Sequence, residues 1–423
     1  HSFPTRRSSD LVALLRGPVP VPFLIAPLES AINTELAGVR VAIGSVILQR
    51  GRWGGVRLRL RNVALRDEDG DVVARAPLAA VRLSTEALMH GRIAPKQVDF
   101  IEPRLLVSYT PEGGLTLSFG RGADNERPGN GREPPQAAPA APATAAPARP
   151  DEGGGRRIDL AQMLSRASER ARSGNDAASF LTSFGLRDAV VVLDRPGQQT
   201  AWRVPSMIIQ LDHRQKRSII TGKARVMSDG EPWTLVFRAE DSQKQKSLTI
   251  SLDADGLVPA RLAASLDGLA GLRALDSRVK LNMVLTLDRR GDIQATSTRL
   301  VLGPGHIRVG KAAGEALAIE GGDVVLRYER AKPGEIQVAE SVLSGAWGNV
   351  RFAGLVKQVG PDAGVGDWRF DLAAKEGRLA GREPGSPTFA IDRLQLAGRI
   401  LAATDTGWLE TARLEFGGAA FAM

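Results

Sequence analysis

The chain has 423 residues, with 56 Lys and Arg against 47 Asp and Glu, which gives a formal net charge of +9 and a pI near 10.2. At about 150 residues per domain this length predicts two or three domains. There is no Cys and there are four His, which excludes disulfide scaffolds, cysteine-ligated zinc, iron–sulfur sites and a cysteine nucleophile. The excess positive charge is spread as single arginines and forms no basic arm, so it does not indicate nucleic-acid binding.

The N-terminal segment divides into two parts. Residues 1–11, HSFPTRRSSDL, look like a translated sequencing adaptor and are left out of the fold prediction. Residues 12–22 start with a short apolar run that Arg16-Gly17-Pro18 ends. We interpret this run as the end of a membrane anchor whose larger part is missing, since about twenty apolar residues are needed to cross a bilayer. The alternative is an ordinary short helix end.

Residues 23–126 are predicted to form an N-terminal β unit. An amphipathic stretch over 23–36 precedes residues 56–61, in which Val and Leu alternate with Arg. This period of two is typical of a strand with one wet face. The acidic run 67–71 supplies hairpin-turn residues, and 78–83 is the expected partner strand. Four carboxylates in this run also suggest calcium, but turn chemistry explains them better. Further strands are expected at 98–101, 104–109 and 115–119.

Residues 127–155 interrupt the pattern with seven prolines, eight alanines and no Val, Ile, Leu or aromatic residue. Such a composition cannot bury enough apolar surface to fold, so we predict a disordered Pro/Ala-rich linker. It stands where a hairpin loop within one continuous sheet could have grown long. A helix is expected over 158–184, from the spacing of its Leu and Ala residues.

Residues 156–423 are dominated by strands from Leu186 onward. The clearest run is Val279, Leu281, Met283, Leu285 and Leu287, which alternates with mostly polar residues. We count about eighteen strands in the chain, joined by short Gly and Asp turns without a βαβ rhythm. One helix is expected over 258–275. The fold class is therefore mainly β with a few short helices.

Catalytic motifs are weak in this sequence. Ser277 and Lys280 match S-x-x-K, but the two side chains would lie on opposite faces of a strand. His90, His213 and His306 are far apart and have no second ligand at short spacing. The basic turn 213–217 could meet phosphate groups, although a solvated hairpin tip is the simpler interpretation. We predict no enzyme activity, no cofactor and no metal.

A family resemblance is carried by several segments in a fixed order. These segments are Arg16-Gly17-Pro18 with Phe23-Leu24 and the helix Glu29 to Ile32, the block from Val56 to Ser84, Leu88 to Ile93, Ile101 to Leu105, Leu193 to Gly197, Trp202 to Pro205, Leu257 to Pro259, Leu269 to Asp276 and Leu287 to Gly291. In this order they resemble the AsmA-like family, specifically its YhdP-type branch. The resemblance extends over most of residues 16–400.

The resemblance implies a long curved antiparallel β-sheet that forms an open, taco-like groove for lipid between two membranes. It implies an inner-membrane anchor at a missing N-terminal helix, a periplasmic body, and a non-enzymatic role in carrying phospholipid for outer-membrane lipid homeostasis. Envelope proteins are further candidate partners, and no nucleic acid is expected. The alternative is a structural β-protein that scaffolds the envelope and has a dry core. Members of this branch are usually much longer, so we expect a fragment truncated at the C-terminus.

The candidate groove residues are the apolar positions of three alternating strands. They are Trp233, Leu235, Phe237, Leu248, Ile250, Leu252, Val279, Leu281, Met283, Leu285 and Leu287. An aliphatic lining of this kind suits non-specific contact with sliding acyl chains.

Overall fold

A computed structural model describes most of the chain in separate ranges. These are 18–35, 39–50, 56–67, 72–91, 94–110, 114–116, 180–195, 198–214, 217–228, 230–242, 247–265, 272–288, 292–308, 316–359, 367–381, 387–401, 406–417 and 419–422. Residues 1–11, residues 12–17 of the expected anchor, the linker 127–155 and residues 158–179 of the expected helix lie outside these ranges. So does most of the acidic turn at 67–71.

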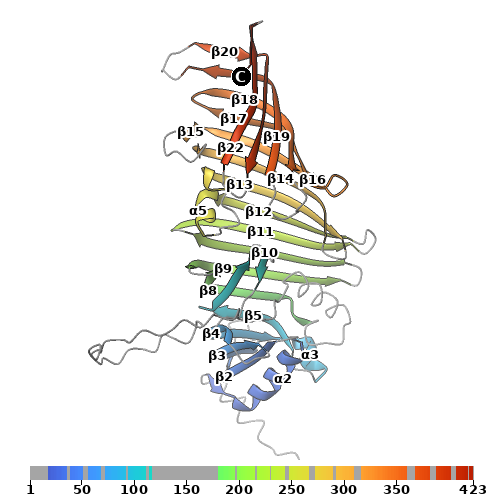
Figure 1. Cartoon of the computed structure of the whole chain (residues 1–423). Coiled ribbons are helices and arrows are strands. Elements are labelled where there is room, and N and C mark those ends of the chain that lie inside the picture. The colour runs from blue at the N-terminus through green and yellow to red at the C-terminus, as the bar shows by residue number, and fades with distance from the viewer. Residues whose placement is uncertain are drawn as a thin grey trace, which may run out of the picture.

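The described strands form one sheet of 23 strands that rises as a long twisted ladder (Figure 1). The strands before the linker are β1 (Val19–Pro20), β2 (Val39–Arg50), β3 (Val56–Asp67), β4 (Val72–Leu83), β5 (Pro95–Ile101), β6 (Arg104–Thr110) and β7 (Gly114–Thr116). The next strands are β8 (Ser183–Arg195), β9 (Gln198–Arg214), β10 (Arg217–Ser228), β11 (Glu231–Ser242), β12 (Ser247–Leu257), β13 (Leu275–Asp288) and β14 (Ile293–Arg308). The last are β15 (Ala316–Ile319), β16 (Gly321–Glu329), β17 (Glu335–Gly345), β18 (Gly348–Val359), β19 (Asp367–Ala380), β20 (Thr388–Ile391), β21 (Arg393–Leu401), β22 (Thr406–Phe416) and β23 (Ala419–Ala422).

The predicted fold class is confirmed: the chain is mainly β, with one long antiparallel sheet and a few short helices. The helices are η1 (Pro22–Leu24), α2 (Ile25–Glu35), α3 (Thr85–Met89) and α5 (Pro259–Ser265). Almost every strand pairs with its neighbour in sequence as an antiparallel hairpin, because short turns join them. Two pairings differ, since β8 runs parallel to both β5 and β6.

These parallel pairings join the regions before and after the linker into one sheet. Val98 on β5 lies opposite Phe184 on β8, and Leu105 on β6 lies opposite Val191. The expectation of a single sheet is confirmed, but the expectation of an overgrown hairpin loop is wrong. A hairpin would make these strands antiparallel, whereas parallel neighbours need a crossover connection.

Three expected boundaries also need correction. Residues Ser183 and Phe184 begin β8 and are not the end of a helix. The helix expected over 258–275 is shorter, since α5 ends at Ser265 and Leu275 starts β13 opposite Ile307. At the N-terminus, Val19 and Pro20 pair with Leu48 and Ile47 of β2, so this part of segment 12–22 belongs to the sheet.

Helix α2 closes the first edge of the sheet. Asn33 Oδ1 accepts a hydrogen bond from Val41 N at 2.6 Å, and Asn33 Nδ2 donates to Val41 O at 3.3 Å. Glu29 Oε1 accepts from Ile43 N at 2.7 Å. These side chains take the place of a neighbouring strand, so the β2 edge is satisfied where β1 does not reach.

Candidate functional site: the apolar face of the sheet

One face of the sheet carries unbroken rows of apolar side chains, which we call the apolar face. Residues that are directly opposite in the register lie on the same face. Traced from β2 to β22, one row consists of Leu48, Leu58, Val81, Val98, Phe184, Ile209, Gly222, Phe237, Leu252, Met283, Thr298, Leu326, Val338, Gly354, Leu372, Leu396 and Ala412. Thr298 is its one polar member. At about 4.8 Å per strand the row is roughly 75 Å long.

All of the candidate groove residues on β11, β12 and β13 lie on this face. The register joins Leu235, Ala254 and Leu281 in one row and Phe237, Leu252 and Met283 in the next. It also joins Ala239, Ile250 and Leu285, and then Asp241, Leu248 and Leu287. Val279 lies opposite Leu257, and Trp233 lies opposite Val226 of β10. The alternation in the sequence therefore places the candidates side by side across three strands.

The candidates are half-buried in most cases. Only Val279, at 1% exposed, and Leu287, at 8%, are buried. Leu235, Phe237, Ile250, Leu252, Leu281, Met283 and Leu285 each retain an intermediate exposure. Side chains between two packed sheets would be almost fully covered, because interiors pack without gaps. In the part of the chain that the structure describes, no second layer covers these residues.

The apolar face is buried at the end of the sheet formed by β2 and β3, which we call the first end. Leu28 of α2 packs with Val41, Ile43, Val46 and Leu58, and Leu58 has no exposed surface. Figure 1 shows α2 lying against this lowest end of the ladder. Helix α2 therefore forms a lid over the apolar rows of β2 and β3, while the rows farther along remain half-exposed.

One margin of the face is also buried. Val279, Leu302 and Ile319 form a cluster that Trp347 and Leu343 pack against. Helix α5 and the short strands β15 and β20 lie along the same side of the ladder in Figure 1. The rows nearest this side are therefore the more buried ones, and the rows nearer the middle of the strands stay half-exposed.

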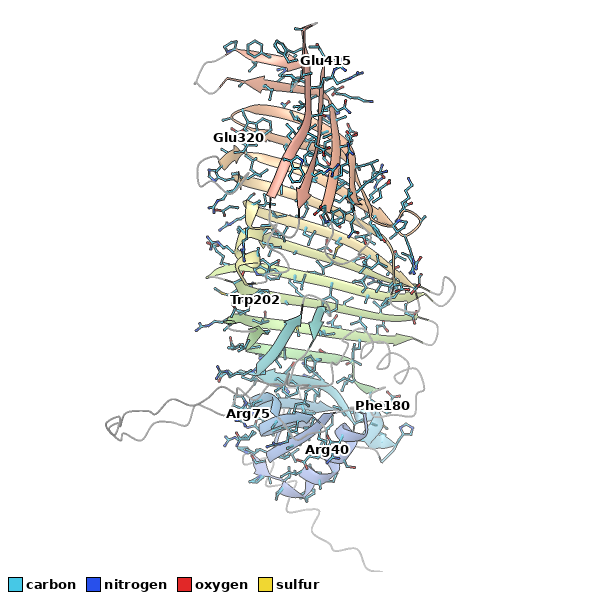
Figure 2. All side chains as sticks on the ribbon, in the orientation of Figure 1. Arg40, Arg75, Phe180, Trp202, Glu320 and Glu415 are labelled. Atoms are coloured by element: carbon cyan, nitrogen blue, oxygen red, sulfur yellow. The ribbon has the colours of Figure 1, made fainter. Side chains whose placement is uncertain are left out.

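Few polar atoms interrupt the apolar face. The indole nitrogen of Trp233 donates to Ser228 Oγ at 3.1 Å, so it is satisfied within the protein. Trp202, labelled in Figure 2, packs with the cluster of Leu186, Val204 and Val226 around the middle of the sheet. The indole nitrogen of Trp202 is buried and has no hydrogen-bond partner among the described residues. Apart from such isolated groups and Asp241 at the end of its row, the face offers contact area to apolar groups.

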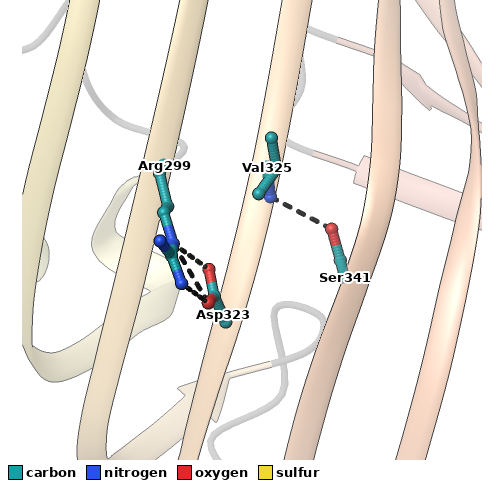
Figure 3. Close-up of polar contacts among 4 residues, drawn as sticks. All are labelled: Arg299, Asp323, Val325 and Ser341. Atoms are coloured by element: carbon teal, nitrogen blue, oxygen red, sulfur yellow. Dashed lines mark hydrogen bonds and ion pairs between the residues drawn. The ribbon is translucent and has the colours of Figure 1, made fainter.

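The opposite face, which we call the outer face, carries charged side chains in cross-strand pairs. Lys357 Nζ lies 3.0 Å from Glu335 Oε2, and Arg351 Nη1 lies 3.2 Å from Glu340 Oε1. Arg299 Nε donates to both carboxylate oxygens of Asp323 at 2.9 and 3.0 Å (Figure 3). These hydrogen bonds lower the pKa of Asp323 and raise the pKa of Arg299 from their ordinary values.

Two shallow hollows lie on the outer face and not on the apolar face. One is lined by Gln210, Asp212, Thr221 and Arg238 among others, and one surrounds the Arg299–Asp323 pair. Both are lined largely by polar and charged groups. Because both hollows are on the outer face, they are not part of the apolar rows.

The weaker motifs have ordinary structural surroundings. Ser277 is buried, its Oγ donates to Gly303 O at 2.7 Å, and Lys280 is exposed. His90 ends α3, with its Nδ1 at 2.8 Å from Glu86 O, and His306 is exposed on β14. The side chains of the basic turn 213–217 lie outside the described residues. No group of three His, Cys, Asp or Glu residues within the described ranges could hold a metal ion.

Comparison of the chain with protein-family models, with curated proteins and with solved structures found no match. Among the helices that the structure describes, none is both long and apolar enough to cross a bilayer. The site is accordingly defined by geometry alone: one long sheet, with one half-exposed apolar face and one charged face.

Proposed function

We propose that the protein is a non-enzymatic carrier of phospholipid, whose acyl chains lie along the apolar face. The observation that carries this proposal is the continuous row from Leu48 to Ala412 combined with the intermediate exposure of its central members. The row would give acyl chains a continuous path roughly 75 Å long. The resemblance to the AsmA-like family supports the same reading.

The physical basis is the transfer of methylene groups from water to an apolar surface. Each CH₂ that is buried contributes about 0.8 kcal/mol, so acyl chains gain from lying on Phe237, Leu252 and Met283. Because the row through Phe237, Leu252 and Met283 has no charged side chain, neighbouring positions along it offer similar contacts. A lipid could therefore move between them without breaking a specific hydrogen bond.

The proposal includes the location that the resemblance implies. The body would lie in the bacterial periplasm, held at the inner membrane by an N-terminal anchor, and would supply phospholipid to the outer membrane. Other envelope proteins would be its partners.

The alternative is a structural scaffold of the cell envelope with a dry core. The buried margin at Val279, Leu302 and Ile319 is the observation that favours it, since these side chains pack against one another. In that case a covering layer, supplied by a partner protein, would shield the remaining half-exposed residues.

Native mass spectrometry with lipid extraction separates the two functions. The full chain is purified from a bacterial envelope, and we expect several phospholipid molecules on each chain. Lipid-free, monodisperse protein would contradict the carrier proposal and favour the scaffold.

A pair of variants on one strand tests the site. Met283→Glu places a charge in the middle of the apolar face, and Val284→Glu places the same charge on the outer face, where Val284 is 44% exposed. We expect Met283→Glu to remove most bound phospholipid and to leave the protein folded, because water reaches this position. Val284→Glu should retain its lipid. Unfolding of Met283→Glu alone would indicate a dry core.

A further inference from the structure

Four exposed arginines lie close together on the outer face near the first end of the sheet. Arg57, Arg59 and Arg61 follow one another on the same face of β3, and Arg82 on β4 is directly opposite Arg57. We call these four residues the arginine patch. Along a strand, alternate side chains are about 7 Å apart, and opposite side chains are about 5 Å apart.

No carboxylate neutralises the arginine patch among the described residues, because none of its four side chains has an ion pair there. In the row of Arg59, the next charged residue is Asp99 on β5, beyond Ala80. Asp99 already accepts a hydrogen bond from Gln97 Nε2 at 3.0 Å and lies 3.9 Å from Arg187 Nη2.

Several cations of the later strands are paired with carboxylates on the same face. Arg299 is paired with Asp323, Lys357 with Glu335, and Arg351 with both Glu340 and Glu376. Opposite charges on adjacent strands support a sheet, and like charges directly opposite each other destabilise it. Arg57 and Arg82 are directly opposite and carry the same charge, so an anion bound between them would relieve their repulsion.

The shape of the patch indicates which anion fits. Guanidinium groups bind phosphate through paired hydrogen bonds, and four of them on one flat face match an array of phosphates. Aliphatic residues are their cross-strand neighbours on the same face: Ile47 and Ala80 flank Arg59, and Leu78 is opposite Arg61. No aromatic ring is placed among them in the described residues, so the patch lacks the stacking platform that single-stranded nucleic acid prefers.

We propose that the arginine patch docks the first end of the sheet onto a bilayer surface that contains anionic phospholipid. The patch is on the outer face, whereas α2 covers the apolar face of the same strands. Docking through the outer face therefore does not cover the half-exposed apolar rows of the later strands. Figure 2 labels Arg40 and Arg75 at this same end of the ladder. The proposal does not depend on lipid carriage.

The test is co-sedimentation of the full chain with phosphatidylcholine vesicles, with and without phosphatidylglycerol. We expect binding only to the anionic vesicles, and weaker binding as salt is added. Each basic residue near an anionic surface contributes about fivefold to partition, so Arg57→Gln/Arg59→Gln should bind roughly 30-fold more weakly. Arg57→Lys/Arg59→Lys should retain most binding.

A matched control uses Lys223→Gln/Arg225→Gln, which removes two exposed outer-face cations of β10. This control should bind the anionic vesicles as the unchanged chain does. Equal loss in both double variants, or no loss in either, would overturn the proposal. Binding to duplex DNA that depends on Arg57 and Arg59, without vesicle binding, would also overturn it. Met283→Glu should still bind the vesicles, which separates this result from failure of lipid carriage.

Discussion

The ring of Phe237 on β11 lies over the α-carbon of Gly222, its direct partner on β10. A β-carbon at position 222 would collide with the ring. At Gly398 on β21 a β-carbon would meet the ring of Phe370 on β19 and also the main-chain oxygen of Trp408. In both places the glycine leaves the space that the phenyl ring of the neighbouring strand occupies.

Gly222→Ala is therefore expected to lift Phe237 away from the sheet and to lower the free energy of unfolding by about 1 to 2 kcal/mol. In a Phe237→Ala background the same change should instead stabilise by roughly 0.5 to 1 kcal/mol, since alanine suits a strand better than glycine. Urea unfolding of the four proteins in this cycle measures both effects. An equal change in the free energy of unfolding in both backgrounds would show that ring and glycine do not interact.

The side-chain cap on the β2 edge gives a second prediction. Asn33→Ala removes both hydrogen bonds to Val41 and should cost about 1 to 2 kcal/mol. Amide hydrogen exchange should accelerate at Val41 and change less at Ile43, which Glu29 still holds. Asn33→Asp keeps the acceptor for Val41 N and should protect that amide better than alanine does. Unchanged exchange at Val41 in the alanine variant would contradict the capping role.

The Arg299–Asp323 pair gives a prediction about pH. The pKa of the Asp323 carboxyl is lower in the folded protein than in the unfolded chain. Its contribution to stability is therefore present above the ordinary carboxyl pKa and is lost as pH falls through the lowered value. In Arg299→Gln, carboxyl NMR should show Asp323 titrating at a higher pH, and high salt should narrow the difference. Identical titration in both proteins would show that Arg299 is not the cause.

The margin of the apolar face gives a fourth prediction. Trp347 Nε1 donates to Ala318 O at 2.8 Å and so ties the β17–β18 turn to β15. Trp347→Phe keeps most of the ring contact and loses this bond, at a cost of about 0.5 to 1.5 kcal/mol in unfolding free energy. Trp408→Phe on the 44% exposed Trp408 is the matched control and should be nearly neutral. Equal effects in the two variants would count against the role of the hydrogen bond.

The strands that sequence reasoning predicts best are those with strict alternation. In β13, Leu281, Met283 and Leu285 alternate with Asn282 and Val284, and the structure places the first three on the apolar face. A one-residue slip would reverse the faces of the whole strand, so the pattern specifies both the strand and its orientation. The candidate site on β11 to β13 follows from this pattern alone.

Strand β2 could not be predicted in the same way, because its alternation of apolar and polar residues is interrupted. Val46, Ile47 and Leu48 are consecutive apolar residues, and the β2–β3 register omits the pair of Gly44 and Asn62. Asn62 has a positive φ of 52°, which marks an irregularity that alternation cannot reveal. The hydrogen bonds from Asn33 to the β2 edge could not be predicted from the sequence either, because only the packing of α2 brings Asn33 and Val41 together.

The parallel contact of β8 with β5 and β6 could not be predicted either. A tight turn between two strands can be recognised from its residues, but here the paired strands are separated by the whole of residues 117–179. Charge pairing is similar: Arg299 and Asp323 meet through the register of β14 and β16. Sequence spacing alone does not report that register.

The parallel contact also separates the continuity of the apolar rows from the continuity of the polypeptide. Between Val98 and Phe184 the row is carried by main-chain pairing of β5 with β8. A nick within residues 117–179 would therefore leave two fragments whose strands still interlock, and the rows would cross the break without a gap. The protein could in this sense be reconstituted from two separate polypeptides, each of which contributes its own strands to a common sheet.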